Sequence, residues 1–192
     1  MTGRPTFAPM LEGFFTQRLM RQRRASAHTI ASYRDSFQLL LQFVHERLGK
    51  APSALMLEDI DAPLIAAFLD ELEAKRGITA RTRNLRLTAI HSFFRYVAFE
   101  APANAAQTQR VLAIPAKRFT RTLVPFLSRP EVDALLAAPD QQAWSGRRDH
   151  ALILLAVRAG LRRSELTNLV PADLQLVAGA HVHVIGKGRK ER

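Results

Sequence analysis

Residues 26–49 read SAHTIASYRDSFQLLLQFVHERLG, and the pattern of this stretch decides the fold class. Apolar side chains recur at spacings of three and four, at Ile30, Tyr33, Phe37, Leu40, Val44 and Leu48. This spacing places them on one face of an amphipathic helix. Ser26 can cap the start of that helix, and Gly49 can end it because glycine readily adopts the left-handed conformation. The stretch therefore predicts a helix with a signal at each end.

The sequence on either side of this helix continues in the same way. Further helices are predicted at residues 7–24, 62–76, 79–100 and 105–112. Asp61 and Thr79 can cap two of them, and Gly77 can end one. The last three residues of the first segment, QRR, close a basic run. Residues 1–113 therefore read as one helical domain.

A second domain is predicted after a linker. Residues 114–127 contain Pro115 and Pro125 and show no helical repeat, so they are expected to connect two domains. Ser128 and Glu131 then have the spacing of a capping box, which predicts the first helix of a unit that spans residues 128–192.

This second unit changes from helical to strand periodicity. After a loop with Trp144 and Gly146, residues 147–160 read RRDHALILLAVRAG, which fits a buried strand or a buried helix. Length and the charged start favour the helix. Residues 174–184 then alternate in polarity, which predicts a small β-hairpin. The fold class is therefore mainly α, with an α+β start to the second unit.

The composition points to a polyanionic partner. The net charge is +11 and the isoelectric point is about 11.2, so nucleic acid is the first candidate. Three spans contain arginines but no acidic residue, namely residues 13–34, 74–99 and 101–130. The alternative explanation of the arginine content is a GC-rich coding bias, but such a bias does not explain this clustering.

Other classes of protein fit the sequence less well. It contains no cysteine, so disulfides and thiolate metal sites are excluded. The start lacks the apolar segment of a signal peptide, and the apolar run at 151–157 is too short to cross a bilayer. We expect a cytoplasmic protein with no membrane contact, no metal, no cofactor and no small-molecule ligand.

The predicted helix at 79–100 carries a polar, cationic face opposite its apolar one. Arg81, Asn84, Thr88, His91 and Arg95 repeat at three and four. Such side chains can bond phosphates and base edges in a DNA groove, although a solvated face would show the same pattern. The predicted DNA contacts are Arg81, Arg83, Asn84, Arg86, Thr88, His91 and Arg95 here, with Arg118 and Arg121 of the linker.

Two further stretches can carry phosphate chemistry. In AGLRRSEL, residues 159–166, Arg162 at a helix start can hold two phosphate oxygens, or it can simply pair with Glu165. In HVHVIGKGRKER, residues 181–192, Lys187 can reach a phosphate or donate a proton, or it can be a solvated turn. The two histidines of this stretch lack a third ligand, so a metal site is not expected there.

Taken in order, these segments resemble the tyrosine recombinase (phage integrase) family, as in Xer-like proteins and the integrases of insertion elements. Residues 26–44 resemble its Ser-x-x-Thr-x-x-x-Tyr helix, and residues 82–97 resemble a later helix of its SAM-like core-binding domain. Residues 148–166 and 184–192 resemble the opening of its catalytic domain. The resemblance implies a helical core-binding domain followed by the first part of a catalytic domain.

The resemblance also implies residue roles. Arg162 matches the first catalytic arginine, Glu165 the acidic residue of the same turn, and Lys187 the catalytic lysine of the hairpin. The family cuts DNA through a 3′-phosphotyrosyl link without metal or cofactor; arginines offset charge on the phosphate, and the lysine protonates the leaving 5′-oxygen. The implied partners are double-stranded DNA and other recombinase protomers, in integration, recombination or transposition of mobile elements.

The chain departs from the family pattern after the lysine hairpin. It shows no His-x-x-Arg motif, and its two tyrosines, Tyr33 and Tyr96, fall on predicted core helices. We therefore expect a recombinase cut short, which binds DNA without cutting it. Whether this chain is itself an enzyme is left open. We also expect a second domain less stable than the first, because it would lack apolar cover.

Two alternatives remain beside a shortened recombinase. One is a DNA-binding module that uses the core-binding domain alone and competes with a full-length relative. The other is a helical transcription regulator, which would leave the GLRRSEL and GKGRKER segments without an explanation.

Overall fold

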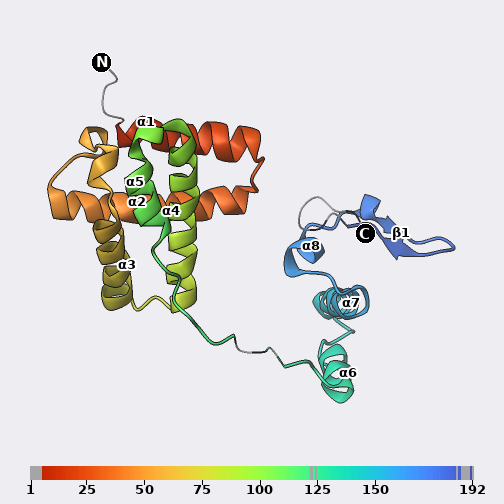
Figure 1. Ribbon diagram of the computed structural model, residues 1–192. Helices are drawn as coiled ribbons and strands as arrows, with labels where there is room; N and C mark the ends of the chain where they lie inside the picture. The colour runs from red at the N-terminus through yellow and green to blue at the C-terminus, as the bar shows by residue number, and fades with distance from the viewer. Residues whose placement is uncertain (1–5, 122, 124, 185, 187–190, 192) are drawn as a thin grey trace. The chain divides into compact units, whose positions relative to one another are not determined.

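The computed structural model describes residues 6–121, 123, 125–184, 186 and 191. The chain divides into two compact units, Met1–Arg121 (unit 1) and Thr122–Arg192 (unit 2), which are shown in Figure 1. Lys187, the predicted catalytic lysine, lies outside the described residues. The predicted fold class, mainly helical with a small antiparallel hairpin, is confirmed.

Unit 1 is built from helices and short helical turns. The long helices α3 and α4 lie side by side and are joined by a loop at Gly77 (Figure 1). The elements are α1 (Phe7–Gly13), the π-helix η1 (Phe14–Gln22), α2 (Ala27–Leu48), the 3-10 turns η2 (Pro52–Ala54) and η3 (Leu57–Asp59), α3 (Ala62–Arg76), α4 (Ala80–Glu100), the 3-10 turn η4 (Pro102–Asn104) and α5 (Ala105–Leu112).

The predicted caps fix the starts of the three long helices. The side-chain oxygens of Ser26, Asp61 and Thr79 accept the N–H groups three residues on, at 3.2, 2.8 and 3.3 Å. Each bond satisfies an N–H group that the helix itself cannot pair. Gly49 and Gly77 end α2 and α3 with φ of +65° and +58°. These boundaries are therefore confirmed.

An aromatic cluster forms the centre of unit 1. The ring of Phe93 in α4 lies 5.3 Å from Phe7, 5.6 Å from Phe14 and 5.4 Å from Phe37, measured between centroids, and all four side chains are buried. The rings meet edge to face, the arrangement that their quadrupoles favour. The cluster joins α1, η1, α2 and α4 into one core.

The segment between α1 and α2 has a geometry that the sequence did not indicate. Residues 14–22 form a π-helix, a rare widened form of helix. Just before it, Gly13 lies against Tyr96, and a Cβ atom at position 13 would be only 2.6 Å from the tyrosine hydroxyl. Burial, together with the negative charge of Glu100, raises the pKa of that hydroxyl. A side chain at position 13 would displace Tyr96.

Unit 2 contains short helices and one hairpin. Its elements are α6 (Arg129–Ala137), α7 (Trp144–Ala159), α8 (Arg163–Thr167), the 3-10 turn η5 (Pro171–Asp173), β1 (Leu174–Gln175) and β2 (His181–Val182). The strands are antiparallel and pair Leu174 with Val182. The predicted capping box is present, because the Glu131 carboxylate accepts the Ser128 N–H at 2.7 Å. The predicted hairpin is confirmed.

Helix α7 corrects two expectations. It begins at Trp144, so Trp144 and Gly146 lie in its first turn and not in a loop. Gly146 allows this because its Cα is in tight contact with the backbone of Asp140, and a Cβ atom would lie 1.8 Å from the Asp140 carbonyl oxygen. The apolar run 151–157 is helical, as predicted, but residues 152–156 are only half-buried, and Ala151 and Val157 are exposed.

Candidate nucleic-acid interface

Helix α4 presents only part of its predicted cationic face to solvent. Arg81, Thr88 and Arg95 are exposed, whereas Asn84, Arg86 and His91 are half-buried. In the linker, Arg118 and Arg121 are exposed. The exposed predicted contacts in unit 1 are therefore Arg81, Thr88, Arg95, Arg118 and Arg121.

Arg83 does not lie on this face. Its side chain is buried, at 5% exposure, and its Nε lies 3.4 Å from Oε2 of Glu73 in α3. A buried guanidinium requires a counter-charge, and Glu73 supplies it. The predicted DNA contact at Arg83 is thus corrected, because this side chain holds α4 to α3 and cannot reach an outside partner in this conformation.

Two other predicted contacts bond within the fold. Arg86 Nη1 donates to Ser36 Oγ at 3.1 Å and to the Ser32 carbonyl at 3.3 Å, which joins α4 to α2. His91 Nε2 lies 3.1 Å from the Val111 carbonyl of α5. Burial lowers the pKa of His91, the positive charge of Arg95 lowers it further, and the Val111 bond partly opposes both. His91 is therefore neutral at pH 7, and its bond to Val111 joins α4 to α5.

Thr88 and Asn84 also have partners in the fold. The Thr88 hydroxyl donates to the Asn84 carbonyl at 2.8 Å, one turn back in α4, and remains able to accept a bond from outside. The Asn84 side-chain amide is paired with the backbone of Lys117. Of the predicted face, the arginines Arg81 and Arg95 are the ones best placed for an outside anion.

A second exposed cationic surface lies in the acid-free span 13–34, outside the predicted DNA contacts. Arg21, Arg23 and Arg24 are exposed where η1 gives way to α2, and Arg24 has a φ of +45°. Arg18, one turn earlier, donates to Gln22 at 2.9 Å. The absence of acidic residues from 13 to 34 was the signal that could have assigned this surface.

In unit 2, Arg162 and Glu165 form a fixed pair. Arg162 Nη1 donates to Glu165 Oε1 at 2.8 Å, and the Arg162 backbone N–H donates to Oε2 at 2.8 Å. The Glu165 side chain is buried, at 5% exposure, while the Arg162 side chain is 61% exposed. The pair with Glu165 is therefore present, and it leaves the guanidinium facing solvent. Since α8 has only five residues, its dipole adds little for an anion.

The hairpin lies close to this pair. Glu165 of α8 and His183 and Val184, which follow β2, line one hollow of about 230 Å³. His183 is exposed, with Nε2 3.6 Å from Oε2 of Glu191, and His181 Nδ1 lies 2.8 Å from the Gly179 carbonyl. Both histidines are exposed to solvent. The structure therefore brings the hairpin to the turn of Arg162, while the position of Lys187 itself stays a prediction.

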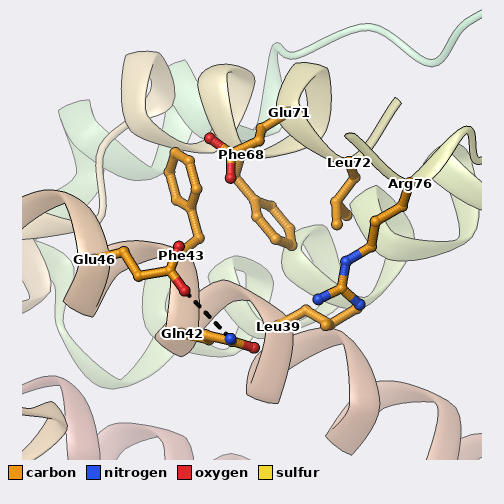
Figure 2. Close-up of a pocket in the computed structure, with 8 residues that line it drawn as sticks. All are labelled: Leu39, Gln42, Phe43, Glu46, Phe68, Glu71, Leu72 and Arg76. Carbon is orange, nitrogen blue, oxygen red and sulfur yellow. Dashed lines mark hydrogen bonds between the residues drawn. The ribbon is translucent and has the colours of Figure 1, made fainter. Parts of the chain in front are cut away.

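The described residues form no metal site, and the hollow between α2 and α3 is too small for a ligand pocket. Over the described ranges, no group of three histidine, aspartate or glutamate side chains could hold a metal ion. The hollow between α2 and α3 in Figure 2 has room for about 50 Å³, with Phe43 and Phe68 at its floor and Glu46, Glu71 and Arg76 at its rim. Ligand pockets usually hold several hundred cubic ångströms, so this hollow is too small.

None of the described helices is both long enough and apolar enough to cross a membrane.

Comparison with known proteins identifies the family. Residues 13–100 match the phage integrase N-terminal SAM-like domain. The chain is 68% identical to "Putative integrase/recombinase y4rC" of Sinorhizobium fredii, over all of this chain and 58% of that protein. It is 35% identical to tyrosine recombinase XerC of Rhodospirillum centenum, over 91% of this chain and 50% of that protein. The chain belongs to the tyrosine recombinase (phage integrase) family.

A solved structure has the same fold. The XerH site-specific recombinase, in a post-cleavage complex with its palindromic difH substrate, matches with a TM-score of 0.62 and 22% identity. The match covers 88% of this chain and 49% of that one. The chain spans about half to three fifths of the length of the relatives named here.

Proposed function

We propose that this chain supplies the DNA-binding surface and the first catalytic residues of a site-specific recombinase that acts on double-stranded DNA in the cytoplasm. The observation that carries the proposal is the set of exposed arginines without acidic neighbours in sequence, on η1, on α4 and after α5. Such side chains neutralise phosphates and release counterions from DNA. The related fold of XerH, which is bound to its DNA substrate, supports the same role.

The proposed domain organisation follows the prediction. Residues 1–113 would be the core-binding domain, residues 114–127 the linker, and residues 128–192 the start of the catalytic domain. The names of the Sinorhizobium fredii and XerC relatives fit a role in DNA integration or recombination. We further propose that other protomers bind the same DNA. Mobile-element integration and transposition are the settings that we propose for it.

The catalytic part of the proposal rests on Arg162. Its guanidinium is exposed yet held by Glu165 through both side chain and backbone, so little freedom is lost when it bonds a phosphate. Arg162 would offset charge on the phosphoryl oxygens as the phosphorus is attacked. Lys187 would donate a proton to the leaving 5′-oxygen.

The two tyrosines of this chain are unsuited to act as the nucleophile. Tyr33 stacks on Phe14 with ring centroids 6.3 Å apart, and Tyr96 lies 5.9 Å from the same ring. Both are partly buried against the core of unit 1. The raised pKa of Tyr96 also makes its phenolate harder to form. We therefore propose that the chain binds DNA but does not form a phosphotyrosyl link by itself.

A fluorescent duplex titrated with the chain at several salt concentrations tests this function. The logarithm of the affinity should fall with the logarithm of salt, with a slope of about −0.9 per phosphate neutralised. An affinity that does not depend on salt would contradict DNA binding through arginines. A nicked suicide substrate should give no covalent adduct on a denaturing gel, and an adduct would show that one of these tyrosines does attack.

A DNA-binding module that acts through unit 1 alone is the second candidate. The contrast between the well-packed core of unit 1 and the sparse one of unit 2 favours it. In that case Arg162→Ala would leave competition with a full-length relative unchanged, whereas Arg81→Ala would weaken it.

A further inference from the structure

The segment after α5 is attached to α4 at one residue. The Asn84 side-chain Nδ2 donates to the Lys117 carbonyl at 2.7 Å, and the Lys117 backbone N–H donates to Asn84 Oδ1 at 2.9 Å. One amide side chain thus pairs with both backbone polar groups of a residue 33 positions away. In Figure 1 the chain leaving α5 runs along α4 before it turns away.

A shared carboxylate reinforces this attachment. Lys117 Nζ lies 2.5 Å from Glu73 Oε2, the same oxygen that faces Arg83. Nε and Nη1 of the buried Arg83 make no hydrogen bond among the described residues. The positive charge of Arg83 is balanced by the Glu73 carboxylate, which lies 3.4 Å from Nε. The carboxylate therefore stays where it is, because moving it would leave a buried guanidinium unpaired. Lys117 is held by α3 and α4 together.

Beyond Lys117 the segment lies beside α4. Phe119 lines one hollow together with five residues of α4, namely Arg81, Thr82, Asn84, Leu85 and Thr88. Arg118 lies between Lys117, which bonds Asn84, and Phe119, which shares a hollow with the first turns of α4, and the Arg118 side chain is exposed. The expected linker, which begins at residue 114, is thus attached to unit 1 at Lys117 and lies beside α4 as far as Phe119.

We infer that Asn84 is a positioning residue for DNA binding, which holds residues 117–119 on α4 so that Arg118 joins Arg81 in one cationic surface facing the phosphates. The inference rests on the proposed function, since it concerns the surface that meets DNA. A free linker would carry the same charge but would lose entropy when it bonds a phosphate. Because the Asn84 amide already holds the segment, this entropy is lost when the protein folds and not when it binds DNA.

Amide hydrogen exchange of the full chain tests the attachment. In Asn84→Ala, the Lys117 amide should exchange about tenfold faster, because two hydrogen bonds of modest strength are lost. Alanine is a good helix former, so α4 should remain intact. Gln107→Ala is the matched control. Gln107 Nε2 also makes two bonds to backbone carbonyls, at 2.7 and 3.0 Å, but its acceptors are Leu57 and Ile60 and not Lys117. Unchanged exchange in Asn84→Ala, or equal acceleration in the control, would overturn the inference.

A double-mutant cycle on DNA affinity tests the positioning role. In the wild-type background, Arg118→Ala should reduce the salt slope by about 0.9, the value for one phosphate contact. In the Asn84→Ala background the same substitution should have little effect, because Arg118 is no longer held in place. Equal effects in both backgrounds would overturn the positioning role while leaving DNA binding in place. Salt-independent binding by the wild-type chain would overturn the proposed function and this inference together.

Discussion

Phe93 in unit 1 and Leu154 in unit 2 both lie near the middle of a helix, yet their surroundings differ. Phe93 is fully buried and contacts the rings of Phe7, Phe14, Phe37 and Phe94. Leu154 is only half-buried. Among the described residues of unit 2, Val184 is the one apolar side chain that is buried. Unit 1 therefore contains the partners of its own apolar faces, whereas unit 2 leaves much apolar surface in water.

This difference bears on what each unit contributes. A unit with its own core can fold and present a rigid binding surface, which fits the arginines of unit 1. A half-buried helix such as α7 gains little from burial and is held more weakly. The predictions below test this contrast, from the largest expected effect to the smallest.

The first prediction compares one core substitution in each unit. Phe93→Ala should destabilise unit 1 by about 3–5 kcal/mol, because it empties the aromatic cluster. Leu154→Ala should cost unit 2 about 1 kcal/mol, since Leu154 has less burial to lose. Urea unfolding separates the two, because Trp144, the single tryptophan, reports unit 2 by fluorescence while the helices of unit 1 dominate circular dichroism. Equal losses would mean that unit 2 is as well packed as unit 1.

The second prediction concerns the buried charge of unit 1. Glu73→Gln should cost about 3 kcal/mol, because it leaves the guanidinium of Arg83 buried without its counter-charge. Glu71→Gln is the control: on the same helix, the half-buried Glu71 pairs at 3.0 Å with the exposed Lys75, and this pair should contribute less than about 1 kcal/mol. Thermal unfolding measures both. A loss in Glu73→Gln no larger than in the control would mean that Arg83 does not depend on Glu73.

The third prediction separates binding from stability on α4. Arg86→Ala should destabilise unit 1 by about 1 kcal/mol, because Arg86 bonds Ser32 and Ser36 of α2. Arg81→Ala should leave stability unchanged and weaken DNA binding, since Arg81 is exposed. Unfolding curves and duplex titrations of both variants give the answer. Destabilisation by Arg81→Ala would show that the exposed face also supports the fold.

The fourth prediction is the smallest and depends on pH. Because the pKa of folded His91 is lowered, the unfolded chain binds its proton first as pH falls. The stability from neutral His91 is complete above about pH 6.5, the value of an unperturbed histidine, and is lost as pH falls through the folded pKa. Unfolding of unit 1 between pH 7.5 and 5.5 measures the loss. His91→Gln should flatten the profile, whereas His28→Gln, at an exposed site, should not.

Local signals in the sequence predicted much of unit 1. The caps at Ser26, Asp61 and Thr79 lie three residues from the groups they bond, so a single segment contains both partners. The same holds for the Arg162–Glu165 pair, at a spacing of three. Where both partners lie within one turn, the sequence was sufficient.

The candidate surface was harder to predict, because its partners come from distant segments. The face of α4 carries no carboxylate of its own, yet Glu73 of α3 reaches Arg83 and removes it from the surface. Asn84 is hydrogen-bonded to Lys117, and His91 to Val111. Charge and spacing along one helix cannot show which side chains another element covers. The π-helix of η1 likewise has no recognisable sequence signal.

The close approach of Gly13 to Tyr96 links two positions in the evolution of this family. Any larger residue at position 13 would strike the tyrosine hydroxyl, which lies 2.6 Å from where its Cβ would be. Phenylalanine at position 96 would remove that oxygen and open space. Among related sequences, alanine or serine at the position of Gly13 should therefore occur together with phenylalanine at the position of Tyr96, and the two positions should change as a pair.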